Sequence, residues 1–144
     1  MSAFRFSLQK ALDLRLKQLE KEEAEFKRQT AAVADLERLR AELQAAKLRE
    51  EAMVRESKSL SGHDLAVLAA FRLLVVKQDK EIAARIVEAK KQLAAQQAVM
   101  LEARQRCRLL ERLKERNQAD WQAARDKELD EMASESYLAQ WAKT

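Results

Sequence analysis

Residues 57–64 read Ser57-Lys58-Ser59-Leu60-Ser61-Gly62-His63-Asp64, and they hold the only glycine of a 144-residue chain that contains no proline. Serine, glycine and aspartate favour turns, whereas the long stretches on either side lack the two residues that break helices most strongly. The sequence therefore predicts helices over about residues 4–58 and 64–141, joined by a turn at about residues 59–63. The predicted fold class is all-α, a single long two-helix antiparallel coiled-coil hairpin with a C-terminal helix overhang.

The composition is that of a long helix rather than a globule. Charged residues make up 36% of the chain and aromatic residues 5%, which is typical of coiled coils. The 28 basic and 24 acidic residues are mixed along the sequence and give a net charge of +4. This mild excess permits acidic partners but does not require nucleic acid.

The second half carries a sustained heptad repeat. Steps of three and four residues alternate without a slip, and most of the positions reached are apolar. We expect these positions to form a seam facing the first helix, with a left-handed supercoil. The seam consists of Leu65, Leu68, Arg72, Val75, Asp79, Ile82, Ile86, Ala89, Leu93, Gln96, Met100, Ala103, Cys107, Leu110, Lys114, Asn117, Trp121 and Ala124.

The first half has a looser pattern, in which apolar residues recur every seven positions and the residues between them are polar. The apolar set is Leu12, Leu19, Phe26 and Val33, and the polar set is Arg15, Glu22 and Gln29. We expect Phe4 and Leu8 to begin this helix and Phe6 to face solvent.

An antiparallel hairpin turning near Gly62 pairs residues whose numbers sum to roughly 121. This register places Leu43 near Gln78 and Leu8 opposite Leu113. Ser61 or Asp64 is the expected N-cap of the second helix, because either side chain can accept a hydrogen bond from a first-turn amide.

Residues 65–76 contain a single charge, Arg72, and more apolar side chains than one seam can bury. We expect Phe71, Val67 and Leu74 to point away from the seam, and Leu48 to lie off it on the first helix. An apolar excess of this kind indicates a docking surface near the turn, while wider local packing is the alternative interpretation.

The second helix is expected to outrun its partner from Trp121 onward. This overhang contains Tyr137, Leu138 and Trp141 among acidic residues. It is either a frayed tail or a segment ordered by a partner that its aromatic residues anchor.

A basic run, Arg104 to Arg116, places four arginines on one helix face. The run is either a solvated face or a surface for an acidic partner. Nucleic acid is not expected, because no aromatic stacking platform accompanies the arginines.

Catalysis is not expected, nor is a cofactor or a metal. His63 is the only histidine and lies in the turn, and Cys107 falls on the seam as a small hydrophobe. A single cysteine fits a reducing compartment, and the charged N-terminus lacks the apolar core of a signal peptide. The uncharged run is too short to span a bilayer, so we expect a cytoplasmic protein.

Two short stretches near the ends of the chain, Phe4 to Leu8 and Leu110 to Arg116, resemble motifs of the FliJ family of flagellar export proteins. Phe4-Arg5-Phe6-Ser7-Leu8, followed by Leu12-Asp13-Leu14-Arg15, resembles the family's F-x-F-x-L opening and its apolar-x-apolar-Arg step. Leu110-Glu111-Arg112-Leu113-Lys114-Glu115-Arg116, then Trp121, then Lys127-Glu128-Leu129-Asp130-Glu131-Met132-Ala133 is similar to its closing segment. The length and the midpoint turn match as well.

The resemblance implies a non-enzymatic stalk, similar to the central shaft of rotary ATPases, whose paired ends sit in the pore of a hexameric flagellar export ATPase. It also implies contacts with the cytoplasmic domain of the export gate and with export chaperones, and a place at the membrane export apparatus without membrane insertion. The ring-binding residues would be Phe4, Phe6, Leu8, Leu12, Arg112, Leu113, Arg116 and Trp121.

Gate docking by the family lies toward the turn and uses aromatic and aliphatic residues. The positions that match here are Phe71 and, less well, Leu48, with Val67 and Leu74 in the same apolar excess. Glu51 and Arg55 stand where the family has tyrosines. The alternatives are a generic coiled-coil scaffold that self-associates and the equivalent stalk of a virulence type III secretion system.

Overall fold

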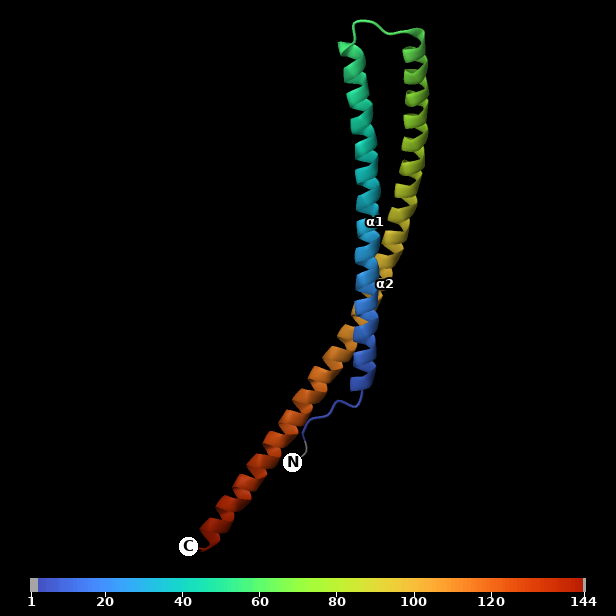
Figure 1. Cartoon of the computed structure of the whole chain (residues 1–144). Coiled ribbons are helices and arrows are strands. Elements are labelled where there is room, and N and C mark those ends of the chain that lie inside the picture. Colours follow the sequence, from blue (N-terminus) through green and yellow to red (C-terminus); the bar gives the residue numbers. More distant parts are fainter. Residues whose placement is uncertain (1–2, 144) are drawn as a thin grey trace. The chain divides into compact units, whose positions relative to one another are not determined.

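The chain folds into two long helices that pack against each other as a hairpin (Figure 1). This computed structural model describes residues 3–143. Helix α1 spans Gln9–Glu56 (48 residues), helix α2 spans Gly62–Lys143 (82 residues), and no strand occurs among the described residues. The predicted all-α hairpin is confirmed.

The first helix begins later than its sequence predicts. Residues 3–8 are not helical, and the Gln9 amide donates to the Phe6 carbonyl at 3.1 Å as α1 begins. The expectation that Phe4 and Leu8 start the helix is therefore wrong, as is the expectation that Phe6 faces solvent. Phe6 is only 7% exposed, because the non-helical segment lets this ring turn inward, and burying an aromatic side chain stabilises the fold.

Ser61 is the N-cap residue of α2 and stands directly before its first residue, Gly62. The Asp64 amide donates to the Ser61 hydroxyl and the Ser61 amide donates to the Asp64 carboxylate, both at 3.1 Å. This reciprocal pair is a capping box, and its hydrogen bonds to the carboxylate lower the pKa of Asp64.

Gly62 does not supply the bend between the helices. It is already the first residue of α2, and no residue in the described part of the chain has a positive φ. The connection is made by residues 57–61, so the expected turn at 59–63 lies about two residues too late.

The packing divides into two units, each described by itself. The loop-side unit is Glu22–Met100, and the terminal unit consists of the described residues up to Lys21 and from Leu101 onward. Buried side chains of the loop-side unit are Val33, Val75, Ile82, Ile86 and Met100, and those of the terminal unit are Phe6, Leu12, Ala103 and Cys107.

The predicted seam of α2 is confirmed over most of its length. From Leu68 to Trp121, the positions of the heptad repeat are buried or half-buried, with one exception, Arg72. Phe71 is half-buried in its place. Leu65 and Ala124, the two ends of the predicted repeat, are exposed.

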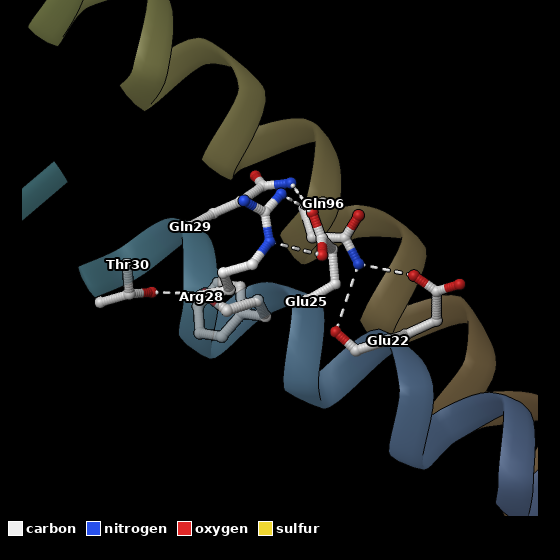
Figure 2. A network of polar contacts seen from close by, with 7 residues as sticks. Glu22, Glu25, Arg28, Gln29, Thr30 and Gln96 are labelled. Atoms are coloured by element: carbon white, nitrogen blue, oxygen red, sulfur yellow. Dashed lines mark hydrogen bonds and ion pairs between the residues drawn. The ribbon is translucent and has the colours of Figure 1, made fainter. Parts of the chain in front are cut away.

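Polar pairs link the two helices of the loop-side unit at positions where the seam is not apolar. Arg40 and Gln44 of α1 donate to the Asp79 carboxylate at 2.9 and 3.0 Å. Gln96 of α2 donates to the Glu22 carboxylate at 2.6 Å and to its backbone carbonyl at 3.2 Å (Figure 2). Polar seam residues of this kind fix the register of paired helices.

The register of the loop-side unit agrees with the antiparallel pairing predicted from the turn. Leu43 and Gln78 line the same surface hollow between α1 and α2, as expected. An ion pair between Lys90 and Glu37, at 3.2 Å, joins the helices further along.

Candidate functional site

A groove opens where the two helices leave the loop. Its volume is about 680 Å³, and its walls come from the last turns of α1, the loop and the first turns of α2. Most of the lining is apolar. The lining residues are Glu50, Met53, Val54, Ser57, Leu60, His63, Asp64, Val67, Leu68 and Phe71.

Two of the four predicted docking residues line this groove. Val67 is 56% exposed on its wall, and Phe71 is half-buried beside Leu68. Leu48 and Leu74 are exposed but do not belong to the lining. The sequence therefore predicted the part of the hairpin where the groove lies, but only two of its ten lining residues, Val67 and Phe71.

Phe71 does not point away from the partner helix as its sequence position suggested. Phe71 occupies the seam position that was expected for Arg72. The seam thus runs from Leu68 to Phe71 in a step of three residues and on to Val75 in a step of four. Burial of an aromatic ring is favourable, while burial of a guanidinium without a partner is costly. The shift of the seam from Arg72 to Phe71 places the ring in the lining of the groove.

The α1 wall of the groove was not predicted. Met53 and Val54 are adjacent in sequence and line the groove together with Val67 and Phe71. Met53 is 72% exposed. The available signal was an apolar pair near the end of the first helix.

The groove also contains acidic groups with different surroundings. Asp64 is held in the capping box. Both carboxylate oxygens of Glu50 are buried and have no hydrogen-bond partner within residues 3–143.

The terminal unit joins the N-terminal segment to α2 through an aromatic pair. The rings of Phe4 and Trp121 are 6.0 Å apart and tilted by 54°, and the Arg125 guanidinium lies 5.4 Å from the Trp121 ring centre. Both interactions are attractive at these distances. Trp121 was expected to begin the unpaired overhang, but it is half-buried against this segment.

The eight predicted ring-binding residues fall into three groups by exposure. Phe6 and Leu12 are buried, and Phe4 and Trp121 are half-buried. The exposed group lies on the surface of the terminal unit, where partners can reach it, and consists of Leu8, Arg112, Leu113 and Arg116.

The part of α2 beyond Trp121 is exposed throughout residues 122–143. Its large apolar side chains are Leu129, Met132, Tyr137, Leu138 and Trp141. In the basic run before it, Arg106 forms an ion pair with Glu102 one turn away, at 2.6 Å.

These surfaces present apolar, aromatic and charged side chains. Within residues 3–143, no three His, Cys, Asp or Glu side chains are grouped so that they could hold a metal ion. Neither helix, over the same residues, offers an apolar stretch long enough to cross a membrane. Comparisons with protein-family models, curated proteins and solved structures found no match to this chain.

Proposed function

We propose that this chain is a non-enzymatic stalk of the flagellar type III protein-export apparatus. In this role the terminal unit binds the hexameric export ATPase, and the loop-side unit docks the cytoplasmic domain of the export gate or an export chaperone. The protein would act in the cytoplasm, at the membrane export apparatus.

The observation that carries the proposal is the contact between the two sequence segments that resemble the FliJ family. Phe4 belongs to the opening segment and Trp121 to the closing one, and their rings are 6.0 Å apart. Phe4 and Trp121 are 117 positions apart in sequence. Their contact therefore joins the opening and closing segments in one part of the molecule. A stalk that inserts its paired ends into a ring requires such a joined end.

Exposure divides the proposed ring-binding residues into two roles. Leu8, Arg112, Leu113 and Arg116 are exposed and would contact the ATPase. Phe6 and Leu12 are buried and would hold the end together. Removing residues 1–12 would therefore disturb the terminal unit itself, so surface substitutions give a sharper test.

The test is the effect of the purified chain on the turnover and hexamer assembly of its cognate export ATPase. We expect the unaltered chain to stimulate turnover, and the double variant Arg112→Glu/Arg116→Glu to lose most of that stimulation. The matched control, Lys80→Glu/Lys91→Glu, makes the same change of net charge at exposed positions of the loop-side unit. Equal stimulation by both double variants, or none by the unaltered chain, would contradict the proposal.

The same assay separates the flagellar role from the virulence alternative. A flagellar stalk stimulates the flagellar ATPase in preference to an injectisome ATPase from the same cell, and a virulence stalk shows the reverse preference. A generic scaffold would stimulate neither and would instead self-associate in sedimentation experiments.

A further inference from the structure

The groove of the loop-side unit holds a carboxylate in an unusual state. Both oxygens of Glu50 are buried, and neither has a hydrogen-bond partner in the described part of the chain. The same side chain lines the groove, with Met53 and Val54 of α1 and Phe71 of α2 among its neighbours in the lining.

Three other acidic groups of this unit have hydrogen-bond partners. Asp79 accepts from Arg40 and Gln44, Glu25 accepts from Arg28, and Asp64 accepts from the Ser61 amide. A buried carboxylate without a partner is destabilising, so Glu50 raises the free energy of the unbound chain. A ligand that supplied a cation to this carboxylate would remove that penalty on binding.

The apolar walls restrict what such a ligand can be. Met53, Val54, Leu60, Val67 and Phe71 favour aliphatic or aromatic side chains. A small hydrated cation would leave these walls uncovered, and an anionic lipid surface would be repelled by the carboxylate. A second copy of the chain would have to bring its own exposed cation to the same place.

We infer that the groove binds a segment of a partner protein that carries an arginine flanked by aliphatic or aromatic side chains. The inference rests on the docking role proposed above and names the chemistry of its partner. The guanidinium is the best match for two unsatisfied carboxylate oxygens, because it donates two parallel hydrogen bonds.

The groove must open slightly for the guanidinium to reach Glu50, since both oxygens are covered in the unbound chain. Met53 is suited to this change. Its unbranched side chain adapts to new contacts, and 72% of it is exposed. The apolar side chains of the ligand would then cover the walls and exclude water from the new ion pair.

The test uses a random peptide library displayed against the full chain. Groove-directed peptides are those whose binding is lost with Val67→Asp. We expect them to share a basic residue, chiefly arginine, beside apolar residues. Their affinity should fall at least tenfold with Glu50→Gln and stay unchanged with the matched control Glu128→Gln, which alters an exposed residue of the terminal unit.

Replacing the shared arginine of a selected peptide by glutamine should cost the same factor, and the two losses should not add when combined. The inference is overturned if groove-directed peptides lack a basic residue, if Glu50→Gln binds them equally well, or if no peptide depends on Val67. Peptides matching a segment of this chain would identify a second copy as the occupant and would also overturn it.

Thermal unfolding of the unbound chain supplies an independent readout. Because Glu50 has no partner within residues 3–143, Glu50→Gln should keep or raise the melting temperature. A lower one would reveal an intramolecular partner and contradict the inference. Glu50→Gln should also retain stimulation of the export ATPase, so loss of groove binding and failure of the stalk role are measured separately.

Discussion

Asp79 is a charged residue in a mostly apolar seam, and it has partners on the facing helix. Its carboxylate accepts hydrogen bonds from Arg40 and Gln44 of the facing helix. The hydrogen bond from Arg40, followed by that from Gln44, lowers the pKa of Asp79. The charged form is therefore favoured in the folded chain.

The lowered pKa predicts a dependence of stability on pH. Because folding lowers this pKa, the unfolded chain binds the proton more tightly. The stabilisation is present above the ordinary aspartate pKa of about 3.9 and is lost as pH falls through the lower folded pKa. Melting temperatures between pH 7 and pH 2 should fall less steeply for Asp79→Asn than for the unaltered chain. The exposed control Asp120→Asn should show the same pH dependence of the melting temperature as the unaltered chain. A weaker pH dependence for Asp120→Asn than for Asp79→Asn would contradict the assignment to Asp79.

Ser61 and Gly62 are adjacent at the start of α2, and we expect alanine substitutions at the two positions to change stability in opposite directions. Ser61→Ala removes the hydroxyl that accepts from the Asp64 amide, and loss of an N-cap costs about 0.5–2 kcal/mol. At Gly62 an added Cβ would meet no heavy atom within 4 Å, apart from its chain neighbours and the nearby backbone of α2 itself, and φ is not positive. Gly62→Ala should therefore stabilise the chain by about 0.4–1 kcal/mol. Urea unfolding measures both changes, and a Gly62→Ala variant less stable than Ser61→Ala would contradict this account of the turn.

At the scale of the elements, the repeat of α2 was predictable because each position of a long helix constrains the next. The start of α1 was not predictable from the same periodicity. Phe4, Phe6 and Leu8 fit either a helix or a non-helical segment, and the choice depends on long-range packing of Phe6 and on the Phe4–Trp121 pair. Only two of the ten residues that line the groove were predicted, Val67 and Phe71, because these two stand in an obvious apolar excess while Glu50 gives no sequence signal.

The last part of α2 should contribute little to stability. Residues 122–143 are exposed along their whole length, and an unsupported helix is marginal in water. A chain ending at Ala133 should melt within about 2 °C of the full chain, since little buried surface is lost, and backbone amides beyond Trp121 should exchange fastest. The matched deletion of residues 1–6 removes the buried Phe6 and should lower the melting temperature clearly. Equal losses from the two deletions would mean that the C-terminal segment is packed.

For the molecule as a whole, the polar pairs of the loop-side unit define which antiparallel pairing is adopted. The Gln96 side-chain amide donates a hydrogen bond to the Glu22 carboxylate across the seam (Figure 2). Replacing both by leucine should raise the melting temperature, because leucine at a seam position adds buried apolar area. The same change should weaken the choice of register. We expect the double variant to form oligomers in sedimentation experiments, whereas Leu93→Ile, a control at a half-buried apolar position, should stay like the unaltered chain.

Cys107 is 2% exposed, and it is the sole thiol of the chain. A thiol reagent in solution can reach its sulfur only during the moments when the surrounding side chains separate. The rate of alkylation therefore measures how often the terminal unit opens locally, and no label has to be engineered. A partner that holds this unit closed would slow the alkylation of Cys107, and a partner that opens the unit would accelerate it.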